Sequence, residues 1–162
     1  MPVHWSSSAS EVAIVRGDQL VADAAGRTVI TATVEGVVGS VDVRVLALPS
    51  REEVGAMLQE RFVDLLRRRD TGAVERILGQ GGRAALQREI VQRMQEPNFG
   101  ARMTRMGDVT PSGPGVAMEF DLRLSWRDGA GAQVQPPAAS FQAMLEPTAA
   151  GWRIAGVNRL RR

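Results

Sequence analysis

The feature that most constrains this fold is a change in hydrophobic period at Pro49. Before it, residues 28–34 (TVITATV) and 41–45 (VDVRV) follow a period of two and flank a glycine-containing turn, a pattern typical of a β-hairpin. Shorter apolar runs lie on either side of a second turn, Arg16-Gly17-Asp18. The first 47 residues are therefore predicted to be entirely β.

After Pro49 the period becomes helical. Ser50 and Glu53 have the spacing of a capping box, which predicts a helix over residues 51–69. We expect a shorter helix over 71–78 and a third over 83–95. The apolar face of the first helix consists of Val54, Leu58, Phe62, Leu65 and Leu66.

From Ala101 onward the period returns to two. One face of a long strand carries Val116, Met118, Phe120, Leu122, Leu124 and Trp126. Further strands are expected through Phe141 and through Trp152. Three helices followed by long antiparallel strands predict an α+β fold in which the helices cover one face of the sheet. We expect two domains, 1–48 and 49–162.

Composition excludes several classes of function. The 20 basic residues are all Arg and face 18 acidic ones, so the net charge is only +2. The pI near 10.7 is high mainly because Lys, Tyr and Cys are absent and little titrates above neutrality. The run Arg67-Arg68-Arg69 suits a helix C-terminus, so no nucleic-acid partner is expected. No apolar run is long enough to cross a membrane.

Part of the first 47 residues resembles a known family. Residues 3–8 (VHWSSS), 12–15 (VAIV) and 24–36 (AAGRTVITATVEG) resemble the second half of a bacterial immunoglobulin-like group 2 domain, over about residues 3–47. The first two strands of such a domain have no counterpart here. The resemblance implies a partial Ig-like β-sandwich in an envelope, periplasmic or secreted protein. That expectation overrides the cytoplasmic location suggested by the lack of signal-peptide features.

A second resemblance covers about residues 50–160. A long helix ending in Arg68-Arg69-Asp70, two further helices and a sheet finishing in residues 151–157 (GWRIAGV) resemble the nuclear transport factor 2-like fold. The resemblance implies a cystatin-like α+β cone with three helices on a curved antiparallel sheet. Ketosteroid isomerases, polyketide cyclases and many binding modules share this fold, so enzymes and binding proteins both remain open.

Few residues suit catalysis. The single His, His4, lies outside the expected cone, and Tyr and Cys are absent, so a general base would have to be a carboxylate. Glu119 and Asp121 lie on the strand face opposite the apolar one, where we expect them to pair with Arg123 or Arg153. The remaining carboxylates have structural interpretations: Asp64 on a helix surface, Asp70 as a helix cap and Asp108 at a strand-end turn.

Other chemistry has no signal either. The turn Gly79–Gly82 lacks the Lys and the Ser or Thr of a phosphate-binding loop. One imidazole without neighbouring ligands does not make a metal site. We therefore predict no catalytic residues, no metal ligands and no cofactor.

Two function classes remain. The first is a noncatalytic envelope module whose cone binds a small apolar ligand or a protein partner; its candidate lining is Phe62, Met118, Phe120, Trp126 and Trp152, which as apolar residues in register also suit a core. The second is a small-molecule isomerase or cyclase with a carboxylate base in the cone. A cone filled by aromatic side chains opposes the second class. The incomplete sandwich exposes an apolar face and an unpaired edge, so residues 3–47 are expected to dock on the cone domain, to pair with a second chain or to swap strands. A homodimer through a sheet face or that edge is one of these open outcomes.

Overall fold

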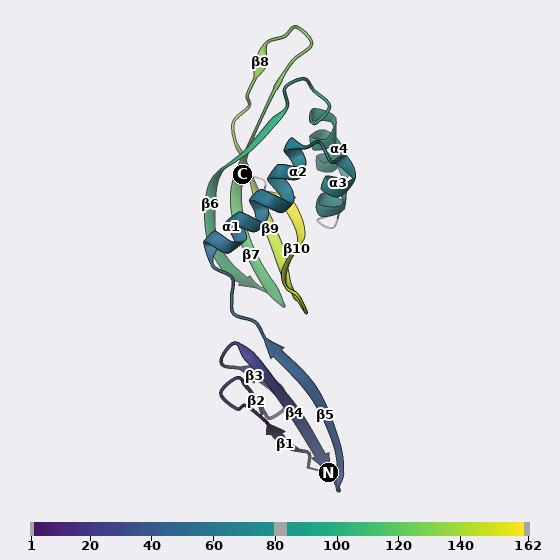
Figure 1. The fold of residues 1–162 in the computed structure, drawn as a ribbon, viewed down its shortest axis with the longest axis vertical. Coiled ribbons are helices and arrows are strands. Elements are labelled where there is room, and N and C mark those ends of the chain that lie inside the picture. Colours follow the sequence, from purple (N-terminus) through teal and green to yellow (C-terminus); the bar gives the residue numbers. More distant parts are fainter. Residues whose placement is uncertain (1, 80–83, 161–162) are drawn as a thin grey trace. The chain divides into compact units, whose positions relative to one another are not determined.

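A computed structural model describes residues 2–79 and 84–160 (Figure 1). The chain divides into two compact units, Met1–Leu48 (the N-terminal unit) and Pro49–Arg162 (the C-terminal unit). The boundary falls at the proline where the hydrophobic period changes. Within the described residues no helix is long and apolar enough to span a membrane.

The N-terminal unit is built on a hairpin of β4 (Gly26–Val34) and β5 (Val37–Val45). Glu35 and Gly36 form its two-residue turn with φ of 50° and 83°, the left-handed conformation of a type I′ turn. The sequence placed the second strand at residues 41–45, and this start was too late. The tight turn lets the strand begin at Val37.

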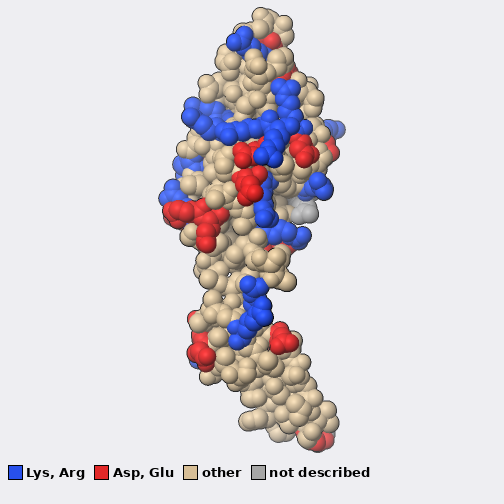
Figure 2. Space-filling view, in the orientation of Figure 1, with Lys and Arg blue, Asp and Glu red and all other residues tan. Residues whose placement is uncertain are grey.

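Two further pairings complete this unit. β1 (His4–Ser7) pairs with β4, which gives an antiparallel sheet of order β1-β4-β5, and β2 (Ala13–Arg16) pairs with β3 (Gln19–Ala22) across the expected turn at Gly17. The unit buries few apolar side chains, among them Val12, Ala13 and Ile30. Figure 2 shows mostly uncharged side chains on its visible face.

The first helix of the C-terminal unit has three parts: α1 (Arg51–Leu58), a π-helical turn η1 (Gln59–Val63) and α2 (Asp64–Arg67). The predicted capping box is confirmed, because Glu53 N–H donates to Ser50 Oγ at 3.2 Å and Ser50 N–H donates to the Glu53 carboxylate at 2.7 Å. The π-helical turn has no signal in the hydrophobic pattern. Arg69, with φ of 58°, follows the helix end.

Two shorter helices follow. α3 (Thr71–Gly79) starts at the Asp70 cap, whose carboxylate accepts the Ala73 N–H at 3.0 Å. α4 (Ala84–Arg93) lies within the predicted range 83–95 and ends two residues early. Most of the predicted glycine turn, and Arg83, lie outside the described residues.

The sheet of the C-terminal unit has the order β10-β9-β7-β6, with every pairing antiparallel. Its strands are β6 (Gly100–Ser112), β7 (Gly115–Arg127), β9 (Ala139–Thr148) and β10 (Gly151–Arg159), and the short β8 (Gln133–Val134) pairs with the end of β7. Register shifts interrupt β6 twice and β10 once, and such bulges bend strands. Figure 1 shows α1 and α2 crossing one face of the sheet, which bears out the predicted layering.

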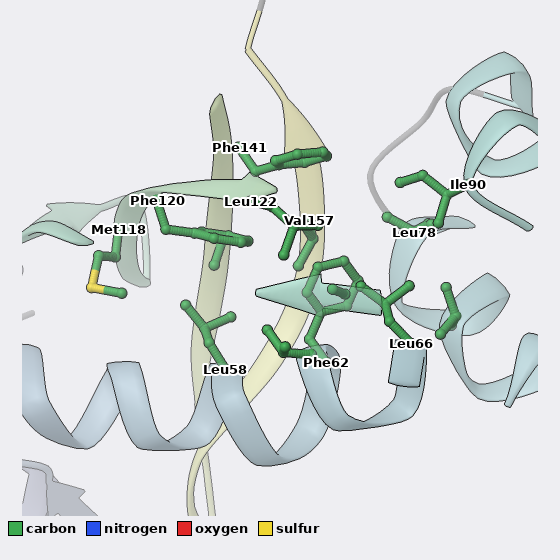
Figure 3. Packing of buried hydrophobic residues seen from close by; sticks show 14 of the residues in the cluster. Leu58, Phe62, Leu66, Leu78, Ile90, Met118, Phe120, Leu122, Phe141 and Val157 are labelled. Carbon is green, nitrogen blue, oxygen red and sulfur yellow. The ribbon is translucent and has the colours of Figure 1, made fainter. Parts of the chain in front are cut away.

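Aromatic side chains fill the space between helices and sheet (Figure 3). Phe62 from η1 meets Phe120 of β7 edge-on, with ring centroids 6.1 Å apart and an interplanar angle of 80°. Phe120 in turn stacks on Phe141 of β9 at 5.7 Å. Leucine, valine and methionine side chains surround the three rings. The centre of the unit is therefore a packed core.

Candidate functional site

A pocket of about 240 Å³ lies in the C-terminal unit, between α4, the sheet and the segment that precedes β9. The lining residues come from four well-separated parts of the chain. They are Glu89, Ile90 and Arg93 of α4, Leu122, Leu124 and Trp126 of β7, Pro136, Pro137, Ala139 and Phe141 before and within β9, and Arg159 of β10.

The interior of this pocket is apolar. Ile90, Leu122 and Phe141 belong to the buried core and also line the pocket. Pro136 and Pro137 form part of another wall, and proline has no backbone N–H to donate. Little in this interior can hydrogen-bond a ligand, so it suits hydrocarbon or an aromatic ring.

Charged groups lie among the lining residues as well. The Arg93 guanidinium lies over the ring of Trp126, 4.8 Å from its centroid, a cation–π contact. Arg93 Nη1 is 3.7 Å from Glu96, and Arg159 Nη1 is 3.5 Å from Glu89. All four of these charged side chains are partly exposed, and ion pairs of this length and exposure are weak. Either arginine can therefore exchange its carboxylate for an anionic group of a ligand.

The five predicted lining residues fall in different places. Trp126 lines the pocket and is 8% exposed. Phe62, Met118 and Phe120 are fully buried in the core, away from the pocket lining. Trp152 packs against the same core from β10 and is partly exposed.

The predicted face of the strand carboxylates is correct, and Asp121 has hydrogen-bond partners other than the predicted Arg123 or Arg153. Arg105 of β6 donates to Asp121 at 2.8 Å, and Ser140 Oγ donates to the other Asp121 oxygen at 2.7 Å. Hydrogen bonding to Asp121, and then the charge of this carboxylate, hold the pKa of Arg105 above its ordinary value. Arg153 instead pairs with Glu146 on the adjacent strand. The register between neighbouring strands decides which charged side chains lie opposite each other, and this register could not be predicted from the sequence.

The other carboxylates have local partners or lie at the surface. Asp64 accepts from Gln59 at 2.9 Å on the surface of the first helix, and Asp70 caps α3, both as predicted. Asp108 was expected at a strand-end turn, but it lies within β6 at a bulge and is exposed. Over residues 2–79 and 84–160, no three His, Cys, Asp or Glu side chains gather into a possible metal site.

Comparison with known proteins gives information about the fold of this chain. No protein-family model and no curated protein matches the sequence. Aln2 from a Streptomyces species matches with a TM-score of 0.52 and 16% identity, over 71% of this chain and 94% of that one. An ntf2-like protein with a cystatin-like fold from Novosphingobium aromaticivorans matches with a TM-score of 0.48 and 18% identity, over 68% of this chain and 80% of that one.

Sequence identities as low as these are evidence about the fold alone. The element order of the C-terminal unit, its bent four-stranded sheet and the match to Aln2 support the nuclear transport factor 2-like α+β fold predicted from the sequence. No match supports an Ig-like group 2 domain in the N-terminal unit. That assignment stays a prediction.

Proposed function

We propose that the C-terminal unit is a noncatalytic binding module for a small, largely apolar ligand that carries one anionic group. The observation that carries the proposal is the pocket beside α4, which has an apolar interior and the guanidinium groups of Arg93 and Arg159 among its lining. The apolar interior would hold the body of the ligand. One of the two arginines would receive its charged end.

The volume of the pocket limits the size of this ligand. A cavity of about 150 Å³ suffices for benzene, whereas drug-sized ligands occupy about 300–1,000 Å³. The volume of about 240 Å³ lies between these values. A fused two-ring aromatic acid is a suitable probe because it combines an apolar body of intermediate size with one carboxylate.

The alternative, an isomerase or cyclase with a carboxylate base, finds less support in this pocket. Glu89 is the carboxylate among the described lining residues; its side chain is 58% exposed and is 3.5 Å from the Arg159 guanidinium. A general base needs a tuned pKa and contact with the reacting proton. Glu89 is instead mostly exposed to solvent, and Phe62 and Phe120 are fully buried in the core, where their rings contact each other edge-on.

Calorimetric titration of the full chain with 2-naphthoate and with the neutral 2-naphthalenemethanol tests the proposal. We expect saturable one-to-one binding, tighter for the acid. Arg93→Gln or Arg159→Gln, whichever removes the arginine that receives the carboxylate, should reduce the affinity for the acid to about that for the alcohol. Ala139→Phe, which adds a ring to the pocket wall, should abolish binding of both.

Arg153→Gln provides the matched control, since this arginine lies on β10 with Glu146 and outside the pocket. It should leave both affinities unchanged. Three results would refute the assignment of this pocket: binding that survives Ala139→Phe, affinity for the acid that is unchanged in both Arg93→Gln and Arg159→Gln, or affinity that falls as much with Arg153→Gln as with the pocket variants.

For the N-terminal unit we propose an Ig-like spacer in an extracytoplasmic protein. The support is the resemblance of residues 3–36, together with an antiparallel sheet and a separate hairpin. Fractionation of the producing cells with an antibody against the full chain tests the location. Recovery in the envelope or the medium is expected, and recovery in the cytoplasm alone would contradict it.

A further inference from the structure

Two arginines are neighbours on the outer face of the C-terminal sheet, opposite the face that α1 and α2 cross (Figure 1). Arg102 of β6 and Arg123 of β7 lie directly opposite each other in the register of the two strands. Leu122 and Leu124, on either side of Arg123 along β7, both line the pocket on the core side of the sheet. Because successive side chains of a strand point to opposite faces, Arg123 and Arg102 point to the outer face. A site formed by them is separate from the pocket.

These two guanidinium groups have an unmet need for an acceptor. Neither arginine forms an ion pair among the residues that the structure describes. Arg123 is half-buried, and its Nε atom is shielded from solvent without a hydrogen-bond partner in that part of the chain. A shielded donor without a partner is unfavourable, and more so when the group is charged. Like charges directly opposite each other on paired strands are unfavourable as well. An anion held between the two arginines would remove both penalties.

The carboxylate two residues from Arg123 on the same face, that of Asp121, is engaged by other groups. One of its oxygens accepts from Arg105 Nε at 2.8 Å, and the other accepts from Ser140 Oγ at 2.7 Å. Arg105 therefore offsets the charge of Asp121. The charges of Arg102 and Arg123 remain available to a ligand.

A hydroxyl group lies next to the two arginines. Ser125 follows Arg123 on the same face of β7 and lies opposite Gly100 of β6. A Cβ atom at Gly100 would lie 2.9 Å from Ser125 Oγ, so the glycine leaves room for this hydroxyl to lie over the strand that carries Arg102. Two guanidinium groups and one hydroxyl provide hydrogen-bond donors from three side chains. Such a set suits an oxyanion with several acceptor oxygens.

We propose that Arg102, Arg123 and Ser125 bind a phosphate dianion, either inorganic phosphate or the phosphate group of a small monoester. A dianion neutralises both arginines, whereas a carboxylate or a phosphodiester supplies only one negative charge. Arginine binds phosphate oxygens through paired, charge-assisted hydrogen bonds, and Arg123 Nε donates one of them. The site is additional to the apolar pocket, and its ligand need not be the ligand of the pocket.

Calorimetric titration of the full chain at constant ionic strength tests the proposal with three probes: inorganic phosphate, glycerol 3-phosphate and dimethyl phosphate. Both dianions should bind saturably and one to one, at least tenfold more tightly than the singly charged dimethyl phosphate. Equal affinity for the two dianions would mean that the site recognises phosphate alone, and tighter binding of glycerol 3-phosphate would identify a monoester as its ligand. Because a phosphate monoester has a second pKa of about 6, its affinity should fall about tenfold from pH 7 to pH 5.

Substitutions locate the binding on this face. Arg102→Gln and Arg123→Gln should each weaken binding of both dianions at least tenfold. Each removes the repulsion within the pair, so the melting temperature in chloride should not fall, and loss of binding is then not caused by unfolding. Arg153→Gln is the matched control, because it removes the same charge from the same face at a position that already pairs with Glu146. It should leave both affinities unchanged.

The side-chain Nε–H signals of the ¹⁵N-labelled chain identify the contact directly. The Arg123 signal should shift saturably with glycerol 3-phosphate, and the Arg153 signal should stay in place. Arg93→Gln and Arg159→Gln should not alter this titration, which separates the site from the pocket. Four results would overturn the inference: no saturable binding of either dianion, equal affinity for dimethyl phosphate, a loss in Arg153→Gln as large as in the site variants, or an unmoved Arg123 signal at saturation.

Discussion

Replacing Phe120 with alanine distinguishes a core residue from a pocket residue. Phe120 is fully buried between Phe62 and Phe141, at centroid distances of 6.1 and 5.7 Å. Truncation of a phenylalanine in such an environment costs about 3–5 kcal/mol, because the transfer free energy of the ring is lost and a cavity remains. Two aromatic contacts, each worth about 0.5–1.5 kcal/mol beyond buried area, place the expected loss in the upper half of that range.

This loss is a large part of the stability of the unit. A domain has a free energy of unfolding of about 5–15 kcal/mol, and for this size each kcal/mol shifts the melting temperature by about 4 °C. Phe120→Ala should therefore lower the melting temperature of the C-terminal unit by about 16 °C. Urea unfolding followed by the fluorescence of Trp126 and Trp152 measures the same change, with little change in the slope m.

Leu20→Ala is the control for this variant. It lies at a half-exposed position of the other unit and should leave the unfolding transition of the C-terminal unit unchanged. A loss below about 1 kcal/mol for Phe120→Ala would be inconsistent with a cavity in a packed core. It would show instead that this ring lines an open pocket, which is one of the two interpretations that the sequence left open.

Three further predictions concern single sites. Trp126→Ala, which removes a pocket wall and the surface beneath Arg93, should weaken 2-naphthoate binding at least tenfold by calorimetry; unchanged affinity would remove Trp126 from the site. Ser50→Ala should lower the free energy of unfolding of the C-terminal unit in urea by about 1 kcal/mol, since it removes a capping interaction; no loss would mean that the cap is dispensable. Gly36→Ala should destabilise the β4–β5 hairpin by about 1–2 kcal/mol, because φ is 83° at this turn; amide exchange along β4 measures the change, and unaltered protection would contradict the type I′ assignment.

Local patterns predicted the elements of the C-terminal unit. The Ser50–Glu53 capping box set the start of the first helix, and the alternation from Val116 to Trp126 identified both faces of β7. These features depend on residues a few positions apart, so one stretch of chain contains the whole signal. The π-helical turn within the same helix changes hydrogen bonding without changing residue types, and it could not be predicted.

The pocket was harder to predict for a different reason. Arg93 and Arg159 are 66 positions apart in the sequence and lie near the ends of α4 and β10. In the sequence, each arginine can be explained as an ordinary charged residue at the end of a helix or a strand. Only the tertiary arrangement places both beside Trp126 and the two prolines. Likewise Phe120 and Trp126 share one strand face, yet Phe120 belongs to the buried cluster beneath the helices, whereas Trp126 lies near the end of β7, beside β8, and lines the pocket.

The most direct test of the binding proposal is a titration of the ¹⁵N-labelled chain with 2-naphthoate, followed through its tryptophan indole N–H signals. The three tryptophans are Trp5 in the N-terminal unit, Trp126 in the pocket and Trp152 on β10. The proposed site predicts a saturable shift of the Trp126 signal, with those of Trp5 and Trp152 nearly unchanged. An unmoved Trp126 signal at saturating ligand, or a larger shift at either of the other two, would contradict it.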